Sequence, residues 1–218
     1  MEPVAAEAPE RRRWPRAVVW TIRVLMVVAV ALGLMALPIA CTIHVKPPAE
    51  VRDPVQVFII DQGRTSSLVL PTGTGQTVRY AFGDWNYYAL SHDGLFDGMA
   101  ALFLPTQGAL GRRVMAAPPV EESVRTSIRA SYEHIYPLTV DASRVAALRD
   151  ELEAVYEQHL DTLIVSEYND FEFVHHPQDY TWFYNSNHMV ADWLRQLGAE
   201  VSRPTYYSTW QIEPAGGR

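Results

Sequence analysis

The chain has 218 residues, of which 48% are hydrophobic and 11% aromatic, and this composition excludes a wholly disordered protein. Its fifteen prolines argue against a simple helical bundle. Residues 1–41 hold five arginines and three glutamates, whereas the remainder holds thirteen basic and twenty-two acidic residues. An acidic remainder with Lys46 as its single lysine argues strongly against nucleic acid as a partner.

The first predicted element is an apolar segment over residues 17–41. Arg23 is its one charged residue, and the seventeen residues from Val24 to Ala40 are uncharged, which reaches the lower limit for spanning a bilayer. Arginines at positions 11, 12, 13 and 16 precede it, so the positive-inside rule predicts a cytoplasmic basic tail over residues 1–16. The sequence therefore predicts attachment to the inner (cytoplasmic) membrane through residues 17–41, with the rest on the periplasmic or extracellular side.

Three fates of this segment are open. A retained signal anchor is favoured, because the apolar run exceeds a usual signal-peptide core. Cleavage as a secretory signal is the second, and lipidation at Cys41 is the third, since residues 37–41 resemble a lipoprotein cleavage box with Pro38 in place of a Leu-like residue. Cys41 is the only cysteine, so the exported part has no disulfide and no thiolate nucleophile.

The remaining elements predict an α+β domain over residues 55–213, in which helices pack on an antiparallel sheet, reached through a linker over residues 42–54. Strands are predicted where β-branched or aromatic residues alternate, with two hairpins, at residues 55–60, 67–71, 78–82, 171–175 and 180–184. Helices are predicted where apolar residues recur at steps of three and four, at residues 94–104, 141–160 and 186–197, so the middle of the domain is expected to be mainly helical.

Three fragments together resemble a known family, namely residues 63–71 (GRTSSLVLP), 80–88 (YAFGDWNYY) and 185–194 (NSNHMVADWL). They are similar to an uncharacterised domain-of-unknown-function family of bacterial envelope proteins, itself distantly similar to permuted papain-like hydrolases of the NlpC and LRAT kind. The resemblance covers most of residues 55–210 and implies a papain-like fold.

The same resemblance implies a histidine base in the first motif and a cysteine nucleophile in the last. Thr65 and Ser186 occupy these two positions. A helix N-terminus stabilises a thiolate, whereas a serine hydroxyl needs an adjacent base that threonine cannot supply. The implied fold is therefore carried over to this chain and the implied activity is not.

The favoured function is that of a pseudoenzyme: a membrane-anchored module, with no cofactor, that binds a peptidoglycan fragment, another envelope small molecule, a lipid or a protein. The alternative is a serine-based hydrolase (amidase, peptidase or acyl type) in which Ser186 uses a relocated histidine. His175, at the end of a predicted strand before the Ser186 helix, is the first choice for that base. A metal site of His175, His176 and His188 would have no carboxylate beside it, so no metal is predicted.

Five further residues form the predicted binding set. Arg64, at a hairpin tip beside small hydroxyl residues, could hold an anionic group. Asp84 could orient a base, and Trp85 with the tyrosines after it could line a groove for a sugar or an acyl chain, although a turn with core anchors is the favoured interpretation. Asn185 and Asn187 flank Ser186, and Asn185 competes with it to cap the helix.

Overall fold

The computed structural model describes residues 15–40, 42–90, 105–166, 168–203 and 205–214. The chain forms two compact units, Met1–Ala40 and Cys41–Arg218. The first holds α1 (Arg16–Ala40). Among the described residues, no helix has the combination of length and apolar character needed to cross a membrane. Cys41 and the helix predicted at residues 94–104 lie outside the described residues.

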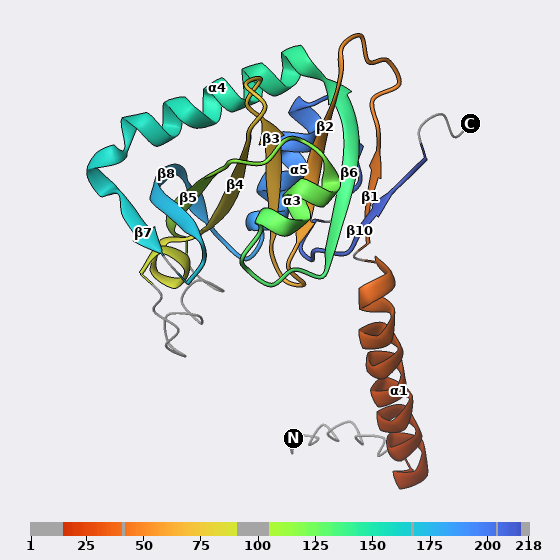
Figure 1. Cartoon of the computed structure of the whole chain (residues 1–218). Helices are drawn as coiled ribbons and strands as arrows, with labels where there is room; N and C mark the ends of the chain where they lie inside the picture. Colours follow the sequence, from red (N-terminus) through yellow and green to blue (C-terminus); the bar gives the residue numbers. More distant parts are fainter. Residues whose placement is uncertain (1–14, 41, 91–104, 167, 204, 215–218) are drawn as a thin grey trace, which may run out of the picture. The chain divides into compact units, whose positions relative to one another are not determined.

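The second unit is built on a seven-stranded antiparallel sheet with the order β6-β2-β3-β4-β5-β8-β7 (Figure 1). The predicted α+β class with an antiparallel sheet is confirmed. The strands of this sheet are β2 (Pro54–Asp61), β3 (Ser66–Pro71), β4 (Thr77–Asp84), β5 (Thr106–Met115), β6 (His134–Asp141), β7 (Ile164–Ser166) and β8 (Phe171–Tyr180).

A smaller sheet has the order β10-β1-β9 and joins the two ends of the second unit. It consists of β1 (Ile43–Lys46), β9 (Glu200–Val201) and β10 (Trp210–Ile212), with β1 parallel to β10. Ile43 and Val45 are completely buried. The segment predicted as a linker therefore begins with a strand of the domain.

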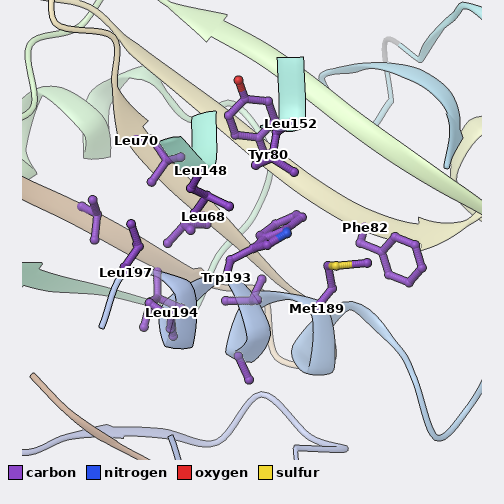
Figure 2. Close-up of a cluster of buried hydrophobic side chains, with 14 of the residues drawn as sticks. Leu68, Leu70, Tyr80, Phe82, Leu148, Leu152, Met189, Trp193, Leu194 and Leu197 are labelled. Carbon is purple, nitrogen blue, oxygen red and sulfur yellow. The ribbon is translucent and has the colours of Figure 1, made fainter. Parts of the chain in front are cut away.

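Helices cover the large sheet on both faces because successive side chains of each strand point to opposite sides. On one face, α4 (Ala142–Gln158) and α5 (Ser186–Gln196) enclose the main core with residues such as Leu68, Tyr80 and Trp193 (Figure 2). On the other face, a second core that includes Phe58 and Val69 packs against α3 (Glu121–Ser127).

Two parts of this unit differ from the prediction. The middle of the domain, expected to be more helical, holds α3 and the predicted helix α4, but it also holds the long strands β5 and β6, for which no strand was predicted. The hairpin predicted over residues 171–184 is wrong, because β8 runs without a turn from Phe171 through Pro177 to Tyr180. Its pairing with β5 shifts register between Thr106 and Gly108, and such a bulge tolerates a proline because the ladder hydrogen bond is already interrupted there.

Candidate functional site

The first and last sequence motifs meet where the β2–β3 hairpin touches the N-terminus of α5. Asn187 Nδ2 donates to the carbonyl oxygens of Arg64 (3.1 Å) and Tyr206 (3.3 Å). Asn187 Oδ1 accepts from Ser66 Oγ (2.7 Å), and Ser66 Oγ in turn accepts from Trp210 Nε1 (2.7 Å). Ser66 and Asn187 are almost fully buried. Three segments distant in sequence are thus joined by one buried polar network.

Asn185, and not Ser186, is the N-cap of α5; the sequence had left both residues open for this role. Its side-chain oxygen accepts from the backbone N–H groups of Asn187 (3.0 Å) and His188 (3.2 Å), and its Nδ2 donates to Tyr206 O (3.0 Å). Ser186, the first residue of the helix, is 2% exposed. Among the described residues, no hydrogen bond joins Ser186 Oγ to an imidazole.

The described histidines are engaged elsewhere. The ring of His175 packs edge-on against Trp85 with centroids 4.2 Å apart, which brings two predicted site residues together in a ring contact. His176 packs against Phe82, and burial lowers its pKa to about 4. His188 lies against Tyr184 and Tyr206, and burial lowers its pKa too. Among the described residues, which do not include His92, the base that a serine nucleophile requires is therefore not seen at Ser186.

Asp84 has a local structural role. It is 3% exposed and is the N-cap of η1 (Trp85–Ala89), where its carboxylate accepts from Tyr87 N (2.8 Å) and from the Thr106 hydroxyl. Within the described residues Asp84 makes no hydrogen bond to a histidine, so the predicted role of orienting a base is not seen there. By capping η1 it fixes the direction in which the following tyrosines leave the sheet.

A large cavity lies beside the β2–β3 hairpin, and its volume is about 1130 Å³. Ala81 lines it and packs with the cluster of Phe171 and Phe173, whereas Phe82 borders the cavity and also belongs to the α5 core. The lining combines aromatic rings, small polar groups and three charges. Its residues are Gln62, Gly63, Arg64, Thr65, Ser66, Ala81, Phe82, Tyr87, Tyr88, Arg129, Ala130, Ser131, Glu133, Tyr168, Asn169, Phe171 and Phe173.

Thr65, the position of the implied histidine, faces this cavity beside Tyr88. Burial raises the pKa of Tyr88, and the adjacent Thr65 hydroxyl opposes that rise. The Tyr88 ring lies directly over Gly83, where any β-carbon would collide with it. Gly83 of the second motif is therefore required for the ring that forms this end of the cavity.

The charged side chains of the lining are Arg64, Arg129 and Glu133. All three are exposed, and within the described part of the chain none of them forms a salt bridge. Arginines that lack a carboxylate partner retain their full capacity to bind an anion in the bidentate mode. The cavity rim therefore favours an anionic group.

The rings of Phe171 and Phe173 form the aromatic floor of the cavity, and a buried arginine lies against one of them. Arg79 is 1% exposed, its guanidinium is 4.7 Å from the centroid of the Phe171 ring, and its Nε donates to Ser67 Oγ (2.8 Å). Burial lowers the pKa of Arg79 to about 10, so its guanidinium stays charged at neutral pH. The nearby carboxylate of Asp170 forms its salt bridge with Arg113. The floor therefore presents aromatic rings backed by positive charge.

Of the predicted binding residues, Arg64 lines the cavity, whereas Trp85, Asn185 and Asn187 belong to packing and capping contacts. Tyr87 and Tyr88, the tyrosines expected to line a groove, do line it. Arg129, Tyr168 and Asn169 also line the cavity and carry no local sequence signal, because they reach it from loops whose positions depend on the sheet order.

Comparison with known proteins adds no relative from which a role could be transferred: no protein-family model, curated protein or solved structure matches the chain.

Proposed function

We propose that the second unit is a non-catalytic, papain-like binding module, and that the cavity beside the β2–β3 hairpin takes an acidic saccharide of the kind found in peptidoglycan. One observation carries the proposal: aromatic rings and unpaired arginines line the same cavity. Sugar rings stack their C–H faces on aromatic side chains, and a carboxylate pairs with a guanidinium. A cavity of about 1130 Å³ is large enough for one or two sugar rings.

The hydrogen-bonding groups of the cavity suit the same ligand. Gln62, Ser131 and Asn169 supply amide and hydroxyl groups at the edges of the aromatic floor. Sugar hydroxyl and acetamido groups need such partners when they leave water, since an unpaired buried polar group costs about 1–3 kcal/mol. Asn169 Nδ2 already donates to Tyr88 O (2.8 Å) and Gln62 Nε2 to Ser131 O (3.4 Å), which leaves their side-chain oxygens and the Ser131 hydroxyl for a ligand. A simple acyl chain would use none of these groups, which makes a fatty acid the weaker choice.

Loss of catalysis is part of the proposal, since the papain-like mechanism needs both a nucleophile and a base. Ser186 is nearly inaccessible and Thr65 cannot accept a proton at neutral pH. The hydrogen bonds of Asn187 link the segments that carry Thr65 and Ser186. The module keeps the cavity next to that junction and uses it for binding.

The charge of the ligand gives the first test. We expect isothermal titration of the full-length chain to show N-acetylmuramic acid binding about tenfold more tightly than N-acetylglucosamine, which lacks the carboxylate, because a charged hydrogen bond contributes about 1.5 kcal/mol. The double variant Arg64→Ala/Arg129→Ala should remove this difference and leave N-acetylglucosamine binding unchanged. Arg52→Ala, an exposed arginine outside the cavity, is the matched control. Equal affinity for both sugars, or no binding of either, would overturn the proposal.

We also propose that residues 17–41 attach the chain to the inner membrane, with the second unit on its outer side. Support comes from the arginines ahead of the segment and the uncharged residues from Val24 to Ala40. We expect the full-length chain to stay with membranes through an alkaline carbonate wash, and a chain that starts at residue 42 to be released. Recovery of the full-length chain in the wash would contradict this attachment.

A further inference from the structure

A second cluster of polar groups lies where the end of β2 meets the start of β6, next to the cavity. Asp61, the last residue of β2, is directly opposite His134, the first residue of β6, and Glu133 N donates to Asp61 O (2.8 Å). One oxygen or nitrogen from each of these three side chains lies within 4.8 Å of the other two. Cross-strand pairing therefore brings two carboxylates and one imidazole to a single point.

The two carboxylates face each other without a cation. Within the described residues, neither Asp61 nor Glu133 forms a salt bridge. Asp61 is 4% exposed, and within the described residues its carboxylate accepts one hydrogen bond of good geometry, from Gly63 N (2.8 Å). Burial raises its pKa, and the charge of Glu133 adds to that rise. A positive charge between the two groups would offset both effects.

A buried hydroxyl also points to a missing ligand at this place. Ser208 is 2% exposed, and its Oγ has no hydrogen-bond partner among the described residues. It lies beside the Asp61 carboxylate and lowers the pKa of Asp61, although the two groups do not reach good hydrogen-bond geometry. Buried hydroxyl groups almost always have a partner in folded proteins, so an additional group is expected here.

The hairpin leaves room for the Glu133 carboxylate. Gly63 has φ 84°, and a β-carbon on it would lie 2.5 Å from Glu133 Oε1. The ring of His134 stacks on Tyr136 with centroids 5.7 Å apart, which restricts its orientation. Both outer ligands are thus held near Asp61 by their surroundings.

We propose that Asp61, Glu133 and His134 bind one divalent transition-metal ion of the Zn²⁺ type. Ligands of a single Zn²⁺ ion at about 2.0–2.2 Å lie within about 4 Å of one another, a distance that small rotations of the exposed Glu133 and His134 would produce. The imidazole favours such an ion over Mg²⁺ or Ca²⁺, which prefer oxygen ligands. Three protein ligands leave a fourth position open, and Glu133 also lines the cavity, so the ion would lie at its rim.

Equilibrium dialysis of the full-length chain against Zn²⁺, with no saccharide present, tests this site separately from the cavity. We expect one saturable equivalent, and a loss of at least tenfold in affinity in both Glu133→Gln and His134→Ala. Both residues are exposed, so neither change should unfold the chain. His44→Ala removes another exposed histidine outside the cluster and should leave Zn²⁺ binding unchanged.

Three results would overturn the site: no saturable Zn²⁺ binding, equal binding in Glu133→Gln and His134→Ala, or loss of binding in His44→Ala alone. A tenfold excess of Mg²⁺ should not displace Zn²⁺. Displacement by Mg²⁺ at that excess would contradict the assignment to a transition metal.

Discussion

Replacing Asn187 with leucine should lower the free energy of unfolding by about 3 kcal/mol, because it removes three hydrogen bonds from a buried network. The carbonyls of Arg64 and Tyr206 would lose a donor, and the Ser66 hydroxyl would lose its acceptor, although Tyr206 O keeps Asn185 and Ser66 Oγ keeps Trp210. Leucine keeps the branched shape of asparagine but is larger, so overpacking at this buried position adds to the loss.

Urea unfolding of the full-length chain, followed by circular dichroism, measures this change. Asn86→Leu is the matched control, since Asn86 is exposed and makes no hydrogen bond through its side chain within the described residues. The control should change stability by less than about 0.5 kcal/mol. If Asn187→Leu costs no more than Asn86→Leu, the network does not hold the hairpin against α5.

Replacing Trp193 with alanine should destabilise the second unit by about 3–5 kcal/mol, because it empties the space between α5 and the sheet. Trp193 is 2% exposed and lies among Leu68, Leu148 and Leu194 of the main core (Figure 2). Large-to-small changes at such sites lose both the transfer free energy of the ring and the contacts around the cavity that remains.

Trp182→Ala is the matched control for Trp193→Ala. Trp182 is 38% exposed and its ring contact with Tyr207 has a centroid distance of 6.4 Å, so we expect a loss near 1 kcal/mol. The same urea titration compares the two. A smaller loss in Trp193→Ala than in Trp182→Ala would mean that α5 is not a principal element of the core.

Local patterns were sufficient to predict several parts of the fold. The hairpin of β2 and β3 follows from two β-branched runs around a glycine turn, and α4 and α5 follow from apolar residues at steps of three and four. The meeting of the first and last motifs at Arg64 and Asn187 is a contact between distant segments that local patterns do not predict.

Other parts depend on contacts between distant segments. Pro177 in an alternating aromatic stretch normally indicates a turn, and the register shift in β5 that accommodates it has no local signal. In the same way, Asp61 and His134 come together through strand pairing across more than seventy residues. Sequence spacing alone therefore missed both the continuous β8 and the carboxylate–imidazole cluster.

We infer that the second unit binds a ligand in the cavity and performs no chemistry at Ser186. The most direct test measures the affinity of two variants for N-acetylmuramic acid. Each variant must first be shown to melt at a temperature close to that of the unchanged chain. We expect Ala81→Trp, which fills the cavity floor, to abolish binding, and Ser186→Ala to bind with unchanged affinity. Loss of binding in Ser186→Ala together with normal binding in Ala81→Trp would contradict the account and place the functional site at the N-terminus of α5.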